Sequence, residues 1–147
     1  MKPRATDLST SRLLTLIRNA VNPEQAGAYS SGHPAPLFKD ALYELMQQKH
    51  LRTKQVIIDS GIEKSYFYRI LSRGQLPGRS MTIRLALSLG CDLKETNRLL
   101  RLAEHSELYP RVSRDAMLIW GITHGLSMSE INELLIQKGE AALYHDK

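Results

Sequence analysis

The chain has very little of what disulfides, zinc sites and membrane spans require. Its 147 residues include one cysteine, Cys91, so an intramolecular disulfide and a cysteine-based zinc site are both excluded. No apolar run approaches the length of a transmembrane helix, and no hydrophobic segment of a signal peptide follows the first twelve residues. These absences predict a cytoplasmic protein that makes no contact with a membrane.

Signatures of catalysis are also scarce. No glycine-rich phosphate loop is present, and no residues combine as nucleophile, base and orienting group. Cys91 follows a glycine expected to end a helix and is interpreted as a core residue. We therefore expect no enzymatic activity, no metal and no cofactor. No two of the five histidines have the spacing of metal ligands on one helical face; they are His33, His50, His105, His124 and His145.

Strand patterns are missing as well. No run of strand length alternates apolar and polar residues between turn residues, and the periodicity is helical nearly throughout, which predicts an all-α fold. Residues 22–36 are rich in Pro, Gly and Ser and predict a loop or linker. The expected helices cover residues 9–20, 37–49, 53–60, 62–72, 80–89, 93–103, 113–124 and 127–138.

Positive charge, by contrast, is concentrated in one short segment. The net charge is +5, yet residues 104–147 carry a net negative charge. A concentrated basic surface attracts polyanions, of which nucleic acid is the usual soluble one. Charge alone leaves open a solvated basic face without a partner. Residues 49–84 hold only Asp59 and Glu63 as acids against eight basic residues, namely Lys49, Arg52, Lys54, Lys64, Arg69, Arg73, Arg79 and Arg84.

The C-terminal half contains an internal repeat. Residues 79–109 align with residues 114–144 at a constant offset of 35, as in GCDLKETNRLL and GLSMSEINELL. In both copies a glycine ends one helix, Asp92 or Ser127 caps the next, and a glutamate three residues later completes a capping box. This predicts a duplicated helical hairpin that extends the core or forms a dimer surface, with chance similarity as the alternative. Trp120 is interpreted as a core residue of the second hairpin.

Residues 53–72 have the spacing of a helix-turn-helix, with a turn at Gly61. In that motif the first helix crosses the phosphate backbone and the second lies in the major groove. Thr53 is placed to cap the first helix and to contact a phosphate, with Arg52 and Lys54 as neighbouring cations.

The second helix, residues 62–72, divides into a polar and an apolar face. Lys64 and Ser65 can contact base edges, and Arg69 flanks them; the alternatives are that Lys64 and Arg69 are solvated charges and that Tyr66 and Tyr68 are packing residues. The loop residues Arg73, Gln75 and Arg79 are expected along the opposite DNA strand. The apolar face and its neighbours form a predicted core of Val56, Ile62, Phe67, Ile70 and Leu71.

Residues 42–93, about a third of the chain, resemble the lambda-repressor-type (Cro/xenobiotic-response-element, XRE) helix-turn-helix domain without a gap. The resemblance implies a five-helix bundle that binds operator DNA, often as a homodimer. It also implies base reading by Lys64, Ser65 and Tyr66, a phosphate or base contact at Thr53 and a backbone contact at Ser72. The chain departs from the family pattern at Ile57, Leu71 and Arg73. The matching positions are Leu42, Leu45, Leu51, Val56, Gly61, Ile62, Phe67, Ile70, Pro77, Ile83, Ala86, Leu89, Gly90 and Leu93.

The sequence thus predicts an N-terminal helix and linker (1–36), a five-helix lambda-repressor-like domain (37–105) and a C-terminal hairpin (106–147) that repeats helices four and five. The expected function is that of a dimeric, sequence-specific regulator of transcription, repressor-like, that binds double-stranded DNA. The alternative is a protein-interaction adaptor or antitoxin-like protein with a partner at the C-terminal hairpin. The predicted base readers are Lys64, Ser65, Tyr66 and Arg69, and the predicted backbone contacts are Arg52, Thr53, Lys54, Ser72, Arg73, Gln75 and Arg79.

Overall fold

A computed structural model describes residues 9–32, 34 and 36–145, and every regular element in these ranges is a helix, as expected. His33 lies outside them. The chain divides into two compact units, Met1–Pro36 and Leu37–Lys147. No helix in the described part is long and apolar enough to cross a bilayer. The helices are α1 (Thr10–Arg18), α2 (Pro23–Gly32), α3 (Phe38–Gln48), α4 (Thr53–Ser60), α5 (Lys64–Arg73), α6 (Arg79–Ser88), α7 (Leu93–Leu102), α8 (Ser113–Thr123) and α9 (Met128–Gln137).

The first unit contains a helix where the sequence predicted a loop. The segment 22–36 holds α2, because Pro23 occupies the first helical position, where its missing N–H costs nothing. The Asn22 side chain accepts a hydrogen bond from the N–H of Gln25 at 2.8 Å, and the Gln25 side chain accepts one from the N–H of Val21 at 2.8 Å. The composition of this segment was therefore misleading: its proline starts a helix instead of preventing one. Helices α1 and α2 pack on each other and bury no residue fully.

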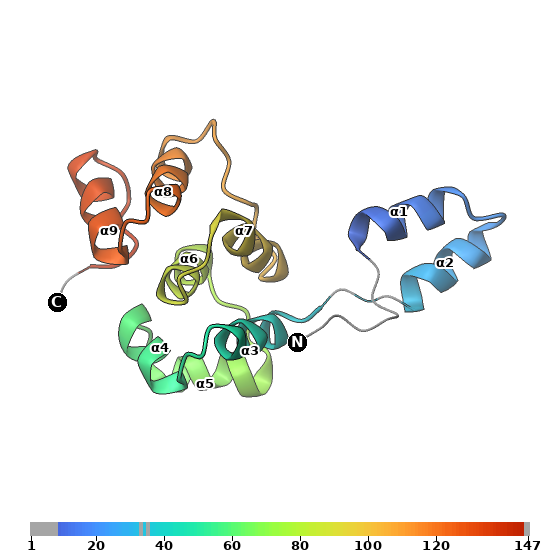
Figure 1. Cartoon of the computed structure of the whole chain (residues 1–147), viewed down its shortest axis with the longest axis horizontal. Helices are drawn as coiled ribbons and strands as arrows, with labels where there is room; N and C mark the ends of the chain where they lie inside the picture. Colours follow the sequence, from blue (N-terminus) through green and yellow to red (C-terminus); the bar gives the residue numbers. More distant parts are fainter. Residues whose placement is uncertain (1–8, 33, 35, 146–147) are drawn as a thin grey trace. The chain divides into compact units, whose positions relative to one another are not determined.

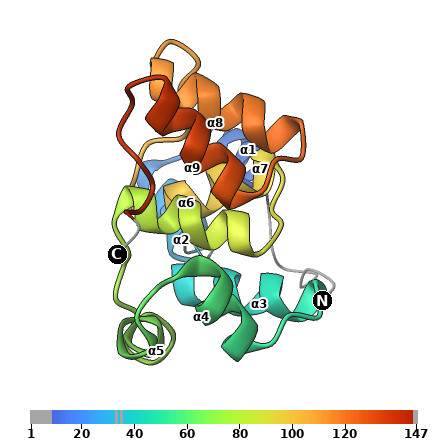
Figure 2. The same cartoon turned by 90° about the vertical axis from the view of Figure 1, so that its left-hand side faces the viewer.

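The second unit is built of three helical layers (Figures 1 and 2). Helices α3, α4 and α5 form the lowest layer, α6 and α7 the middle one, and α8 and α9 the uppermost. The first core lies between the lowest and middle layers and the second core between the middle and uppermost layers. The first core comprises Phe38, Ala41, Leu42, Leu45, Met46, Val56, Ile62, Phe67, Ile70, Leu85, Ala86, Leu89, Cys91, Leu99 and Ala103. The second comprises Ile83, Leu100, Leu108, Leu118, Ile131, Leu135 and Leu143.

The turn between α4 and α5 is made by three residues with different roles. Gly61 has φ +68°, the left-handed conformation that ends a helix, as predicted. Ile62 is buried, and Glu63 is the extended residue before α5. Helix α5 therefore begins at Lys64, two residues later than predicted, because Ile62 serves as an anchor in the first core together with Phe67, the arrangement of a hydrophobic staple.

The internal repeat predicted from the sequence is also a repeat of contacts. Both capping boxes form, at Asp92 with Glu95 and at Ser127 with Glu130. Asn97 accepts a hydrogen bond from the N–H of Leu108 at 2.9 Å, and the equivalent Asn132 accepts one from Leu143 at 2.7 Å. In the same way, Arg79 donates to the carbonyls of residues 106 and 107, and Arg114 to those of residues 141 and 142. Shared hydrogen bonds at one offset are what a duplicated hairpin predicts.

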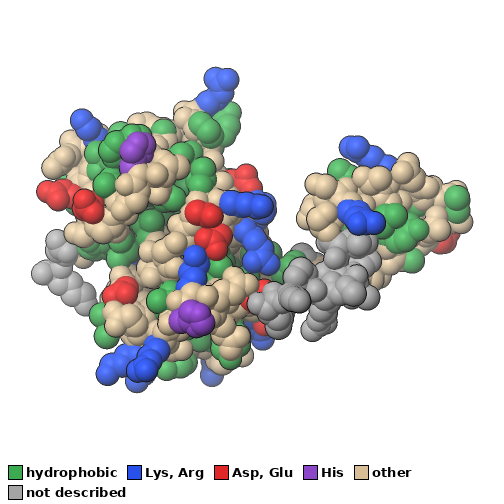
Figure 3. All heavy atoms as spheres, viewed as in Figure 1, with side chains coloured by type: hydrophobic (Ala, Val, Ile, Leu, Met, Phe, Trp, Pro, Cys, Tyr) green, Lys and Arg blue, Asp and Glu red, His purple; other side chains and the backbone are tan. Residues whose placement is uncertain are grey.

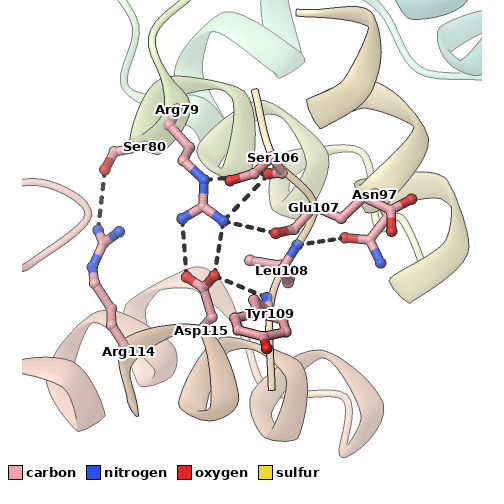
Figure 4. Close-up of polar contacts among 9 residues, drawn as sticks. All are labelled: Arg79, Ser80, Asn97, Ser106, Glu107, Leu108, Tyr109, Arg114 and Asp115. Carbon is pink, nitrogen blue, oxygen red and sulfur yellow. Dashed lines mark hydrogen bonds and ion pairs between the residues drawn. The ribbon is translucent and has the colours of Figure 1, made fainter. Parts of the chain in front are cut away.

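The two hairpins face each other through equivalent residues. Arg79 pairs with Asp115, and Arg114 donates to Ser80 at 3.1 Å, so the contact runs reciprocally between the two copies, as expected of units related by a two-fold axis (Figure 4). The second core is accordingly built on three pairs of equivalent residues, Ile83 with Leu118, Leu100 with Leu135 and Leu108 with Leu143.

Trp120 corrects one prediction. The sequence places it in the core of the second hairpin, yet its side chain is 50% exposed, whereas its equivalent Leu85 is 0% exposed. The reason is the layer order. Leu85 points to the lowest layer, while no described residue of the second unit covers the corresponding face of α8 and α9.

Candidate nucleic-acid interface

The basic segment of the sequence separates into internal and external cations. Three of its eight basic residues hold the second unit together. Lys49 pairs with Glu95 at 3.3 Å, Arg79 pairs with Asp115, and Arg84 donates through Nε and Nη2 to the carbonyl of Ser60 at 3.0 and 2.8 Å. The number of positive charges in this segment that are available to a partner is therefore smaller than the sequence suggests.

Arg79 was predicted to contact the DNA backbone, and its geometry argues against this. Its Nη1 and Nη2 atoms lie 2.9 and 2.8 Å from the two carboxylate oxygens of Asp115, which is 3% exposed. Nε and Nη2 also donate to the carbonyls of Ser106 and Glu107 (Figure 4). With all three guanidinium nitrogens engaged, Arg79 acts as a clamp between α6 and α8.

The remaining five basic residues lie on α4 and α5 or directly before α4. Each is exposed, and none forms an ion pair within the described ranges. Figure 3 shows Lys and Arg side chains gathered over this end of the unit, at the lower left of the view. We call this set the basic cluster, which consists of Arg52, Lys54, Lys64, Arg69 and Arg73.

The N-terminus of α4 differs from its prediction in a way that favours anions. Thr53 was expected to cap the helix, but it is the first helical residue, and Arg52 precedes it without a side-chain cap. Among the described residues, no side chain therefore accepts a hydrogen bond from the first N–H groups of α4. Such groups and the positive end of the helix dipole attract phosphate. Asp59, an acid of this segment, accepts a hydrogen bond from Gln55 at 2.7 Å.

Three predicted residues of α5 and its following loop support one another. The guanidinium carbon of Arg69 lies 5.3 Å from the centre of the Tyr66 ring, a cation–π contact, and Arg69 Nε donates to Gln75 at 3.1 Å. Tyr66 is half-buried against the first core, so it serves as a platform for Arg69 as much as a contact surface. These two contacts favour one orientation of the Arg69 side chain.

Lys64 and Ser65 open α5 on its exposed side. Glu63, to which the sequence gave no role, accepts a hydrogen bond from the Ser65 hydroxyl instead of capping the helix. Ser72 donates to the carbonyl of Tyr68 at 2.6 Å, and Tyr68 is 45% exposed, with its ring perpendicular to that of Phe67. Tyr68 thus belongs to the surface of α5.

Arg84 is a residue whose role the sequence did not predict. It holds the last carbonyl of α4 at the turn, and burial lowers the pKa of its guanidinium. A cation at a helix C-terminus is favourable both as a donor and against the helix dipole. The contact joins residues 24 positions apart, which no local spacing rule detects.

Cys91 lies in the first core, as predicted. Burial, with a smaller contribution from Glu95, raises the pKa of its thiol to about 12, so the thiolate needed for nucleophilic chemistry is absent at neutral pH. Among the residues that the structure describes, no three His, Cys, Asp or Glu side chains gather as a metal site.

Comparison of the chain with models of protein families, with characterised proteins and with solved structures finds no match.

Proposed function

We propose that the protein is a sequence-specific, double-stranded-DNA-binding regulator of transcription, in which α4 and α5 act as a lambda-repressor-like helix-turn-helix. The observation that carries the proposal is the basic cluster, five exposed cations without an acidic partner in the described ranges, on two helices joined by a tight turn. In such a motif the second helix lies in the major groove and the first crosses the backbone.

The electrostatic part of binding comes from Arg52, Lys54 and Arg73. Arg52 and Lys54 flank the uncapped N-terminus of α4, where backbone N–H groups add donors for a phosphate. Ser72 and Gln75 supply further polar contacts on the other side of α5. Neutralising phosphates releases counterions, so binding weakens steeply with salt.

Base reading falls to Lys64, Ser65 and Arg69, with Tyr66 beneath Arg69. Lysine and arginine donate to guanine O6 and N7, and serine serves as donor or acceptor. Because Tyr66 and Gln75 hold Arg69 in place, less side-chain entropy is lost when it meets a base. The proposal includes a homodimer on a site with two-fold symmetry, the arrangement that operator-binding proteins of this type use.

The test is an electrophoretic shift on random duplex DNA at two salt concentrations, followed by selection of bound sites from a random pool. We expect binding that weakens between about 50 and 200 mM salt, and an enriched sequence with two related half-sites. Absent binding, or binding insensitive to salt, would contradict the proposal.

The second candidate is a protein-interaction adaptor or antitoxin-like protein. The observation in its favour is the half-exposed Trp120 on the uncovered face of α8 and α9. A stoichiometric protein partner retained through purification, together with no shift of DNA, would favour this function over DNA binding.

A further inference from the structure

The two faces of the repeated hairpin have different surroundings. One face of each hairpin contributes to the second core. The opposite face of α6 and α7 contributes to the first core, where the lowest layer covers it, through Met81, Leu85, Cys91, Leu99, Leu102 and Ala103.

The equivalent face of α8 and α9, which we call the outer face, has no such cover in the described part of the second unit. It lines two adjoining hollows of about 360 and 290 Å³ that share Trp120 and Leu134. Figure 3 shows hydrophobic side chains at the surface over α8 and α9. At an offset of 35, the outer face consists of Ala116, Trp120, Leu126, Leu134, Gln137 and Lys138.

The first hairpin shows what a cover for this face looks like. Helix α3 lies against α5 and α7, and its apolar residues enter the first core with the spacing i, i+3, i+4, i+7 and i+8. At i+11, directly after the helix, Lys49 pairs with Glu95, the glutamate of the first capping box. The apolar positions are Phe38, Ala41, Leu42, Leu45 and Met46.

The second hairpin keeps the acid of this pair, and no cation of the described residues pairs with it. Glu130 is equivalent to Glu95, lines one hollow with Glu133, and forms no ion pair within the described ranges. Hydrogen bonds from Ser127 hold the pKa of Glu130 below its usual value, so it is charged at neutral pH. Glu130 and Glu133 both line the second hollow, so a symmetric contact of this hollow with that of a second copy brings like charges together.

We propose that the outer face binds an amphipathic helix of another protein, seated against α9 as α3 is seated against α7, with apolar residues at i, i+3, i+4, i+7 and i+8 and a lysine or arginine at i+11 that pairs with Glu130. Helix-in-groove recognition of this kind is read by anchors at such spacing. The inference is independent of DNA binding, because α5 lies in the lowest layer and the outer face belongs to the uppermost (Figures 1 and 2).

The chain itself supplies the probe, a peptide of residues 37–49. A peptide of this length is marginally helical in water, so positions 43 and 47, both exposed one turn apart on α3, are joined by a side-chain bridge. Trp120 is the sole tryptophan of the full chain and the peptide has none, so tryptophan fluorescence reports directly on the outer face. We expect a saturable blue shift of the Trp120 emission.

Three variants test the seating. The peptide Leu42→Asp should not bind, because it loses the central apolar contact. The peptide Lys49→Glu should bind about five-fold more weakly or worse, in line with loss of an exposed ion pair and gain of a repulsion. In the protein, Glu130→Gln keeps the capping box, since glutamine also serves at this position. That variant should weaken binding of the unmodified peptide to a similar degree. It should also bind the unmodified and the Lys49→Glu peptides equally well.

Ile136→Asp is the matched control, because Ile136 is 57% exposed on α9 but lines neither hollow; it should leave binding unchanged. The proposal is overturned if the peptide causes no saturable change, or if Glu130→Gln leaves both peptides binding as before. It is overturned as well if the Trp120 emission changes with protein concentration alone and sedimentation shows dimers, since the outer face would then bind a second copy.

Discussion

Arg79 and Asp115 form a two-pronged ion pair between equivalent ends of the duplicated hairpins, with N–O distances of 2.9 and 2.8 Å (Figure 4). Asp115 also accepts a hydrogen bond from the N–H of Tyr109 at 2.9 Å. The pair thus joins α6, α8 and the segment between α7 and α8. It explains why a positively charged residue in the most basic part of the sequence contributes to folding instead of to a partner surface.

Replacement of Asp115 by alanine should destabilise the second unit. The change leaves the Arg79 guanidinium, whose side chain is 27% exposed, without its acid, and we expect a loss of about 3 kcal/mol in the free energy of unfolding measured in urea. The control is Arg101→Ala, which breaks the exposed pair with Glu107 and should cost less than about 1 kcal/mol. Equal losses in the two variants would contradict the clamp.

The same pair sets the response to acid. Burial raises the pKa of Asp115, but the hydrogen bonds from Arg79 and Tyr109 and the charge of Arg79 outweigh this, so its pKa lies below the ordinary 3.8. A carboxyl whose pKa is lowered by folding contributes stability that is present above pH 3.8 and is lost as the pH falls through its folded-state pKa. In urea titrations, Asp115→Ala should therefore lose less stability than the unmodified protein below about pH 4.

Gly61 and Gly90 allow the cost of backbone strain to be distinguished from the cost of a steric clash when each is replaced by alanine. Gly61 and Gly90 have φ +68°, but a Cβ at Gly61 would lie 3.0 Å from Arg84 Nη2, while one at Gly90 meets nothing within 4 Å. Alanine should cost about 1 kcal/mol at either position for the left-handed conformation. At Gly61 it should cost more, because Arg84 must move from the Ser60 carbonyl. Thermal unfolding of both variants decides this, and a larger loss at Gly90 would contradict it.

Cys91 should be inert in the folded protein. Its side chain is buried and the pKa of its thiol is raised to about 12, so both access and thiolate are lacking at pH 8. A chromogenic disulfide reagent should react at least about 100-fold more slowly in buffer than in denaturant. Fast reaction without denaturant would show that the first core opens around Cys91.

Helical periodicity and capping residues predicted most of this fold, because both act over a few residues. The capping boxes at Asp92 and Ser127 and the glycine stop at Gly61 were visible in the sequence for this reason. The helix at Pro23–Gly32 was missed because its composition indicates a loop unless Pro23 is placed at the first helical position. The exposure of Trp120 was missed because it depends on the layer order, which no local pattern contains.

For a similar reason, the sequence could place residues of the candidate site on their helix, while their role in binding stays a prediction. Sequence spacing placed Lys64, Ser65 and Arg69 on one helix, and all three are exposed there. It could not separate them from Arg79 and Arg84, whose partners lie 36 and 24 residues away in the chain. Whether a basic residue stabilises the fold or is free to bind a partner cannot be decided from the sequence until the acids and carbonyls that pair with it are located.

Arg69 should depend on Gln75 for its part in base reading. Gln75 accepts the Arg69 Nε donor at 3.1 Å and holds the guanidinium against Tyr66. On the selected DNA site, Gln75→Ala should weaken binding. Gln75→Ala combined with Arg69→Ala should cost less binding free energy than the sum of the two separate effects. Anisotropy titrations of the two single variants and the double variant measure this coupling. Strict additivity would mean that the two side chains act separately.

Lys54 and Lys64 should fail in different ways when replaced by alanine. Lys54 lies in the first turn of α4 and is proposed to contact a phosphate, so its loss should weaken binding to all sequences alike and reduce the slope of log affinity against log salt by about 1. Lys64 opens α5 and is proposed to read a base, so its loss should cost about 1–3 kcal/mol at one position of the selected site and relax the preference there. Lys94→Ala, which replaces an exposed lysine on α7 outside the basic cluster, is the control for the loss of one charge.

Titrations on the selected site, on single-base variants of it and on random duplex distinguish the three outcomes. If Lys64→Ala behaved as Lys94→Ala does on every duplex, α5 would not be the helix that reads DNA, and the basic cluster would be a solvated surface.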